Sequence, residues 1–199
     1  MARRFSPATQ RNRGPILEVL RRVLPARGLL LEVASGSGEH AVHFAAHLPG
    51  LEIQPTDPSS EARASIDAWR AHAGPANVRP ALPLDATAPS WPVEAAAAVL
   101  CVNMVHISPW AATLGLLDGA ARLLAGGGPL VLYGPYRIGG AHTAPSNASF
   151  DASLRSRDPR WGVRDLEAVF AAAAERGLVH EETVPMPANN QTVVLRRAL

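Results

Sequence analysis

A glycine-containing turn and two carboxylates predict a binding site for a ligand that contains ribose. The turn, Ala34-Ser35-Gly36-Ser37-Gly38, follows the apolar residues 29–31 and Glu32, and Asp57 comes nineteen positions after Gly38. Glycines permit a tight bend and the close approach of a ligand to the backbone. An acidic side chain at about this distance accepts hydrogen bonds from ribose hydroxyls in dinucleotide-binding enzymes. We therefore expect Asp57 to bind ribose; capping of the following helix is its alternative role.

The residues around this turn point to one of two cofactors. Residues 36–41 match G-x-G-x-x-[G/A], the fingerprint for NAD and related dinucleotides. Glu32 favours another ligand, because a carboxylate repels a pyrophosphate but attracts an ammonium group. An acidic residue before such a turn resembles the first motif of class I S-adenosylmethionine-dependent methyltransferases, with Ala34 in place of the family's usual first glycine. The resemblance implies S-adenosylmethionine as the cofactor and leaves NAD(P) as the alternative.

A second group of polar side chains follows the apolar residues 95–102, which predict a central buried strand. Ligands of open α/β sheets bind at the carboxyl ends of such strands, where Asn103 and His106 stand. The unperturbed pKa of histidine is close to neutrality, so His106 suits a general base; a structural histidine is the alternative. Tyr133 and Tyr136, at the exit of the strand expected at 129–136, are the other catalytic candidates.

The elements that would position these groups alternate between helices and strands. The expected helices are 15–24, 41–48, 59–74, 111–124 and 164–176, and the expected strands are 29–33, 51–57, 78–86, 95–102, 129–136, 178–184 and 192–197. This alternation predicts an α/β fold with a doubly wound, mostly parallel, seven-stranded Rossmann-like sheet and a C-terminal antiparallel hairpin. Two prolines limit residues 78–86 to an edge or a short strand.

We expect one domain over residues 1–199, because this length supports a single full core. Residues 1–14 are polar and are expected to form an irregular N-terminal arm, which either folds over the cofactor or is a frayed terminus. Residues 137–162 are expected to form a long irregular segment that closes over the acceptor as a lid. The expected substrate-binding residues are aromatic or basic: Trp110, Phe150, Arg160 and Trp161.

Composition excludes several classes of function. All 19 basic residues are arginine, so no lysine can form a Schiff base or bind phosphate in a Walker motif. The net charge is +2 and the arginines are scattered, which argues against a nucleic-acid partner. The one cysteine cannot form an internal disulfide. No apolar run approaches the ~18 residues of a membrane span and no signal-peptide core is present, so we expect a cytoplasmic protein without a membrane partner.

Three histidines, His40, His43 and His47, share one helical face. A metal site needs a closed set of ligands, and no carboxylate or cysteine obviously completes this one. We therefore expect a solvated face and no metal.

Several blocks of the sequence together resemble the small methyltransferase-like protein 26 family. They are Ser6-Pro7-Ala8, Arg11-Asn12, Pro15-Ile16-Leu17, Ala34 to His40, Asn103 to Trp110, Phe150 to Arg155 and Trp161 to Asp165. The similarity spans nearly the whole chain and implies a class I methyltransferase fold. The cofactor-binding residues that we expect from it and from the glycine turn are Asn12, Glu32, Ala34, Gly36, Ser37, Gly38, Asp57, Asp85, Ala86 and Asn103.

The function expected from these observations is S-adenosylmethionine-dependent methyl transfer to a small-molecule O, N or S nucleophile. A sulfonium methyl group is already activated, so the main task of such an enzyme is to hold the nucleophile in line with the S–CH₃ bond. The alternatives are an NAD(P)-dependent oxidoreductase and a non-catalytic S-adenosylmethionine-binding protein. The sequence does not predict the oligomeric state or the identity of the acceptor.

Overall fold

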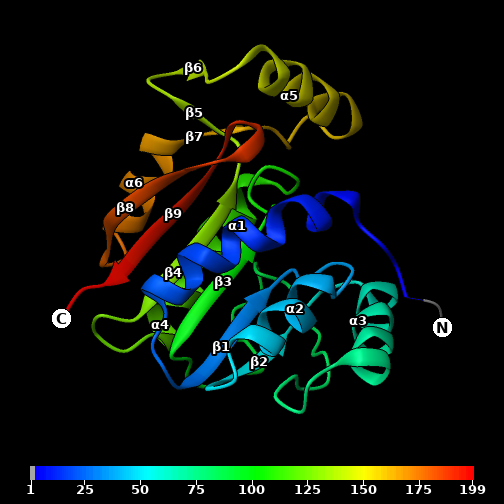
Figure 1. The fold of residues 1–199 in the computed structure, drawn as a ribbon. Helices are drawn as coiled ribbons and strands as arrows, with labels where there is room; N and C mark the ends of the chain where they lie inside the picture. Colours follow the sequence, from blue (N-terminus) through cyan, green and yellow to red (C-terminus); the bar gives the residue numbers. More distant parts are fainter. Residues whose placement is uncertain (1–2) are drawn as a thin grey trace.

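A six-stranded sheet with helices on both faces forms the body of the protein in a computed structural model that describes residues 3–199 (Figure 1). The strand order is β2-β1-β3-β4-β9-β8. The strands are β1 (Gly28–Val33), β2 (Leu51–Pro55), β3 (Ala98–Val102), β4 (Pro129–Gly134), β8 (Leu178–Met186) and β9 (Asn190–Arg197). The first four are parallel, and β9 is antiparallel to both β4 and β8. The expected mostly parallel sheet with a C-terminal antiparallel hairpin is confirmed.

Two apolar layers lie between this sheet and its helices. Helices α1 (Pro7–Val23) and α2 (Glu39–His47) cover one face, and α4 (Trp110–Leu123) and α6 (Leu166–Ala174) cover the other. Helix α3 (Ser60–Ala73) packs beside α2. All five residues of β3 are buried, as expected for a parallel strand covered on both faces. None of the helices described is both long and apolar enough to cross a bilayer.

The sheet has six strands and not the seven that we predicted. Residues 78–86 form only isolated parallel bridges from Val78 to Ile53 and from Leu82 to Thr56. Pro80 and Pro83 lack backbone N–H groups, so a continuous ladder cannot form there. The segment nevertheless runs along β2 and covers that edge of the sheet, with hydrogen bonds to β2 and Asp57 from residues 77, 79 and 82.

The N-terminal arm is also more regular than predicted. Helix α1 begins at Pro7, eight residues before the expected start at Pro15. The Ser6 hydroxyl accepts a hydrogen bond from the Thr9 N–H over 3.4 Å, and a proline suits the first helical position. Pro15 therefore lies inside the helix, where it removes one backbone donor.

The segment predicted to be irregular at residues 137–162 contains regular elements. These are β5 (Tyr136–Ile138), β6 (Ala141–His142) and α5 (Pro145–Arg157), and β5 also pairs with β7 (Arg164–Asp165). Figure 1 shows α5 standing beyond the end of β4, above the tip of the β8–β9 hairpin. Only Asn147, Asp151 and Leu154 of α5 are buried, and two of these residues are polar. The sequence of the helix therefore shows almost no apolar periodicity by which it could have been predicted.

Candidate active site

The glycine turn after β1 contains three residues with positive φ: Ala34 at 58°, Gly36 at 61° and Gly38 at 92°. A Cβ at residue 38 would lie 2.7 Å from the Ile66 Cα, so only glycine fits there. A Cβ at residue 36 would meet nothing within 4 Å, so the backbone at Gly36 is open to a ligand. Ala34 is a non-glycine residue in the left-handed region, which costs ~1–2 kcal/mol and is typical of functional sites.

Asp57 connects this turn to the end of β2. Its Oδ2 accepts a hydrogen bond from the Gly36 N–H over 3.0 Å, and its Oδ1 accepts one from the Ser59 N–H over 2.9 Å. The residue is 8% exposed. Ser59 is the N-cap of α3, since its hydroxyl accepts from the Ala62 N–H. A carboxylate has about four acceptor positions, so Asp57 retains capacity for further donors.

Glu32 is buried beneath the turn at 1% exposure. Its Oε2 has no hydrogen-bond partner among the described residues, and burial raises the pKa of this carboxyl to about 7. The backbone carbonyl of Glu32 accepts hydrogen bonds from both the N–H and the hydroxyl of Thr56. A buried carboxyl oxygen without a partner is uncommon, and such a group favours a site that is completed by a donor from a ligand.

A cavity of ≈480 Å³, called here the turn cavity, lies over the carboxyl ends of β1, β2 and β3. Its lining is Val33, Ala34, Gly36, Asp57, Pro58, Leu84, Asp85, Ala86, Thr87, Val102, Met104, Ile107, Ser108, Pro109 and Ala112. The Asp85 Oδ1 accepts hydrogen bonds from the N–H and the hydroxyl of Thr87, both over 2.8 Å, which fixes this acidic side chain at the wall. The volume and the mostly apolar wall with a few polar groups are typical of a cofactor pocket.

A second cavity, called here the α5 cavity, has a volume of ≈660 Å³ and shares Ile107 with the turn cavity. It lies between α1, the ends of β3 and β4, α5 and the tip of the β8–β9 hairpin. Its lining is Ala8, Arg11, Asn12, Asn103, His106, Ile107, Tyr133, Pro135, Ser146, Asn147, Phe150, Arg157, Pro187, Ala188, Asn189 and Asn190. The two cavities therefore meet at the loop that follows β3.

The predicted cofactor residues divide between these places. Ala34, Gly36, Asp57, Asp85 and Ala86 line the turn cavity. Asn12 and Asn103, which we predicted to bind the cofactor, line the α5 cavity, because α1 begins early and because Asn103, with a φ of 63°, turns the chain out of β3. The remaining three, Glu32, Ser37 and Gly38, belong to the strand and turn beneath the turn cavity and do not line either cavity.

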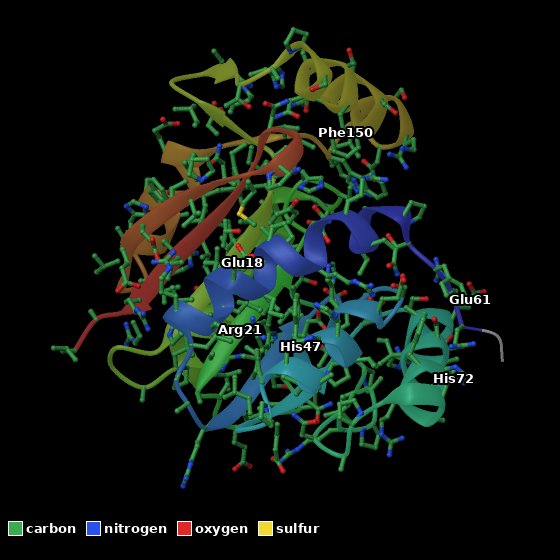
Figure 2. The ribbon with its side chains drawn as sticks, viewed as in Figure 1. Glu18, Arg21, His47, Glu61, His72 and Phe150 are labelled. Carbon is green, nitrogen blue, oxygen red and sulfur yellow. The ribbon has the colours of Figure 1, made fainter. Side chains whose placement is uncertain are left out.

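His106 is held in the wall of the α5 cavity at 4% exposure. Burial, and then the positive charge of Arg164, lower the pKa of His106 to about 4, so the ring is neutral at neutral pH. The His106 ring packs edge-on to Phe150 with centroids 5.5 Å apart, and a Cβ at Gly134 would lie 2.9 Å from the ring. Figure 2 shows Phe150 on the side of α5 that faces the rest of the molecule. A neutral, fixed imidazole can accept a proton.

Tyr133 lines the same cavity and is in contact with polar groups of α1. Burial raises the pKa of Tyr133, whereas a hydrogen bond with Asn12 and the charge of Arg11 oppose this rise. The Asn12 Oδ1 lies 2.8 Å from the His40 Nε2. Burial lowers the pKa of His40 to about 3, so the neutral imidazole can hold the amide of Asn12 in place. The predicted solvated histidine face is therefore wrong for His40.

Four of the predicted catalytic and substrate-binding residues line neither cavity. Tyr136 is fully buried in the apolar layer on the α4 side. Trp110 packs against the same layer, under the Arg164 guanidinium at 5.8 Å. Arg160 forms an exposed ion pair with Asp158. Trp161 lies under the Arg157 guanidinium at 6.0 Å.

Other residues that support the site were missed. Arg164 donates to the carbonyls of Ser108 at 2.7 Å and Val105 at 3.3 Å, so it holds the loop that carries His106. Asn147 Nδ2 donates to the Asn189 carbonyl over 3.0 Å and thereby connects α5 to the hairpin tip. The sequence does contain an indication of this hairpin tip, namely the consecutive asparagines Asn189 and Asn190. Asparagine in a hairpin turn favours positive φ, which Asn189 has.

Glu39 fastens α1 to the glycine turn. Its Oε2 accepts hydrogen bonds from the Ser6 N–H over 2.6 Å and the Ser37 hydroxyl over 3.0 Å, and its Oε1 accepts one from the Gln10 amide over 2.7 Å. The residues at the start of α1 therefore form one wall of the site. Within residues 3–199, no group of three or more potential metal ligands is found.

Solved structures of methyltransferases have a fold similar to that of this chain. The S-adenosylmethionine-dependent methyltransferase SibL matches 96% of the chain with a TM-score of 0.78 and 21% identity. An O-methyltransferase family protein from Burkholderia thailandensis matches 96% with 0.79 and 17% identity. Human N-acetylserotonin methyltransferase, in complex with S-adenosylmethionine, matches 94% with 0.74 and 14% identity. The chain covers 56%, 57% and 55% of these proteins, about half their length. The fold is that of class I methyltransferases.

A family model also matches the chain, over residues 3–197. This range includes every residue that lines the turn cavity or the α5 cavity. The chain therefore belongs to the DUF938 family, which is described as a protein family of unknown function.

Proposed function

We propose that the protein is an S-adenosylmethionine-dependent methyltransferase that acts on a small molecule, with the cofactor in the turn cavity and the acceptor in the α5 cavity. The observation that carries the proposal is the meeting of the two cavities at the loop after β3, with Gly36 and Asp57 in one and His106 in the other. The similar fold of proteins named as S-adenosylmethionine-dependent or S-adenosylmethionine-bound methyltransferases supports it.

The residues of the turn cavity fit this cofactor. Gly36 leaves its backbone open to the ligand, and Asp57 has acceptor positions for two ribose hydroxyls. Asp85 offers a carboxylate to the amino group of adenine, and the walls next to it are apolar, as a flat base requires. The buried Glu32 carboxyl lies beneath the turn and favours an ammonium group above it. This set of acidic acceptors suits S-adenosylmethionine better than the pyrophosphate of NAD(P), the alternative cofactor.

The chain itself contributes positioning and proton transfer. When bound, S-adenosylmethionine supplies a methyl group that is already activated as a sulfonium. His106, neutral and fixed by Gly134 and Phe150, is placed to accept a proton from a hydroxyl nucleophile at its imidazole nitrogen. Tyr133, which lies beside Asn12 in the wall of the same cavity, orients the acceptor through its hydroxyl. Helix α5 covers the cavity and excludes water, the lid role proposed for residues 137–162.

The sequence blocks that resemble the methyltransferase-like protein 26 family support the same function, because several of them contribute to the two cavities. Residues 6–12 supply Asn12, residues 103–110 supply His106, and residues 150–155 supply Phe150. We therefore propose a relationship to that family in addition to membership of DUF938.

Thermal unfolding with S-adenosylhomocysteine or NAD tests the proposal. S-adenosylhomocysteine at 100 times its Kd should stabilise the protein by ~2.7 kcal/mol, whereas NAD should not. Gly36→Val should abolish the response, because its side chain enters the turn cavity. Gly127→Val is the matched control: Gly127 also has positive φ (80°) and open surroundings but lies outside both cavities. Stabilisation by NAD alone would overturn the assignment in favour of an oxidoreductase. Binding of S-adenosylhomocysteine without turnover of any acceptor would favour a non-catalytic binding protein.

A further inference from the structure

The charges in the lining of the α5 cavity have one sign. Among residues 3–199, Arg11 of α1 and Arg157 at the end of α5 are the charged side chains that line it, and no aspartate or glutamate does. His106 adds no charge at neutral pH, because burial and Arg164 lower its pKa to about 4. A cavity with two guanidinium groups and no carboxylate has a positive potential, which attracts anions and disfavours cations.

Neither arginine forms an ion pair with a carboxylate among the described residues. Other arginines nearby do form such pairs: Arg155 of the same helix lies 3.0 Å from Asp151, and Arg160 lies 2.7 Å from Asp158. Arg157 instead lies over the ring of Trp161 at 6.0 Å, and Arg11 lines the cavity together with Tyr133. Both guanidinium groups therefore keep their donors for a ligand.

The rest of the lining is neutral and provides an apolar surface. Phe150 and Ile107 are 37% and 41% exposed, which is high for large hydrophobic side chains. Asn103, Asn147 and Asn189 offer amide groups around them. This combination suits a flat apolar body with polar substituents.

We propose that the acceptor is a small molecule with an apolar body and an anionic group, a carboxylate or a phosphate, that Arg11 and Arg157 bind. This inference rests on the proposed function, because it assigns the acceptor to the α5 cavity. Guanidinium groups bind both anions through paired, charge-assisted hydrogen bonds. Since one arginine comes from α1 and the other from α5, an anion bound between them also draws α5 toward the body of the protein.

Binding of simple probes to protein saturated with S-adenosylhomocysteine tests the inference. The probes are benzoate, phenyl phosphate, neutral benzyl alcohol and cationic benzylamine, and ligand-observed NMR titration gives each Kd. The two anions should bind more tightly than benzyl alcohol, and benzylamine should bind least. The preference between benzoate and phenyl phosphate then identifies the carboxylate or the phosphate as the natural group.

Charge-neutral variants show whether these two arginines are responsible. Arg11→Gln and Arg157→Gln should each weaken benzoate or phenyl phosphate binding about tenfold, the effect of losing one charge-assisted hydrogen bond. Arg21→Gln is the matched control, since Arg21 lies on α1 far from α5 (Figure 2), and it should leave both Kd values unchanged. Equal binding of benzyl alcohol, or equal weakening by Arg21→Gln, would overturn the inference.

The affinity for S-adenosylhomocysteine, measured in the same samples, separates the two proposals. The proposed function fails if the wild-type protein does not bind S-adenosylhomocysteine. The inference alone fails if S-adenosylhomocysteine binds to all variants and the anions show no dependence on Arg11 or Arg157.

Discussion

The backbone N–H of Gly36 donates a hydrogen bond to the Asp57 carboxylate over 3.0 Å. This contact ties the turn after β1 to the end of β2, so the residue expected to bind ribose also shapes the turn that borders the cofactor. Asp57 accepts a second backbone hydrogen bond, from Ser59 at the start of α3. A substitution at Asp57 must therefore affect both ligand binding and folding.

Asp57→Ala should weaken S-adenosylhomocysteine binding by roughly 1.5–3 kcal/mol, the range for hydrogen bonds to a charged group. It should also lower the free energy of unfolding by about 1–3 kcal/mol, because two backbone donors lose their acceptor. Asp67→Ala is the control, since Asp67 also accepts a backbone N–H, from Ala81 at 3.0 Å, but lies outside the turn cavity. Calorimetric titration and chemical denaturation measure the two effects. Unchanged affinity in Asp57→Ala would reduce Asp57 to a structural role.

Glu32 should make the ligand-free protein less stable as the pH rises. Burial raises its pKa from 4.5 to about 7, so in this interval the folded state binds more protons than the unfolded state. The stability contributed by the protonated carboxyl is complete below pH ~4.5 and is lost as the pH passes ~7, a change of about 3 kcal/mol. Buried histidines with lowered pKa values act in the opposite direction. The difference between wild-type and Glu32→Gln unfolding curves removes their contribution. If the free energies of unfolding of wild type and Glu32→Gln change in parallel from pH 4.5 to 7.5, the raised pKa of Glu32 is contradicted.

His106 should act as a base over a wide pH range. Because its pKa is lowered to about 4, the imidazole is already neutral well below pH 6.5. With a hydroxyl acceptor, the acid limb of kcat/KM due to His106 should therefore fall near pH 4. His106→Asn should lower kcat by about 10²-fold, the lower end of the range for a general base, because a pKa of about 4 makes the imidazole a weak base at neutral pH. His72→Asn, on the exposed end of α3 (Figure 2), should have no effect. Full activity in His106→Asn would restrict His106 to a structural role.

Helix α5 should open about the glycines that precede it. Gly139 and Gly140 have φ values of 58° and 76° with open space around them, and the Gly139 N–H is held by Glu167 over 2.9 Å. Proteinase K should cleave near these glycines in the empty protein and more slowly with S-adenosylhomocysteine and an acceptor bound. The turn at residues 126–128, which precedes β4 and so lies at the opposite end of that strand, is the internal reference. Equal protection at both places would indicate general stabilisation and not lid closure.

Asn147→Ala should shift this equilibrium toward the open state, because it removes the hydrogen bond from α5 to the Asn189 carbonyl. Cleavage near Gly139 should become faster in the empty protein, while the affinity for S-adenosylhomocysteine stays unchanged. Ser149→Ala is the control, since the Ser149 hydroxyl bonds only within α5, to the Pro145 carbonyl. If the two variants are cleaved at the same rate, the contact with the hairpin tip does not hold α5.

The sequence alone determined the central strands of the sheet, the glycine turn and the loop after β3. Buried parallel strands need apolar residues along their whole length, so β1, β3 and β4 were recognisable as short apolar runs. The turn was recognisable from its glycines, because Gly36 and Gly38 both adopt a positive φ that glycine tolerates best. Asp57 and His106 were recognisable because polar residues at the carboxyl ends of such strands lie at one edge of the sheet.

The tertiary structure decided which residues share a cavity. Asn12 lines the α5 cavity and not the predicted cofactor site, because α1 starts at Pro7 and is held against the glycine turn by hydrogen bonds to Glu39. Tyr133 and Tyr136 are three positions apart and belong to the apolar layers on opposite faces of the sheet, so one lies in the cavity wall and the other in the core on the α4 side. Helix α5 and the hairpin tip come together through one long-range hydrogen bond, from Asn147 to Asn189. Such contacts join residues far apart in the chain, so local composition and periodicity carry no record of them.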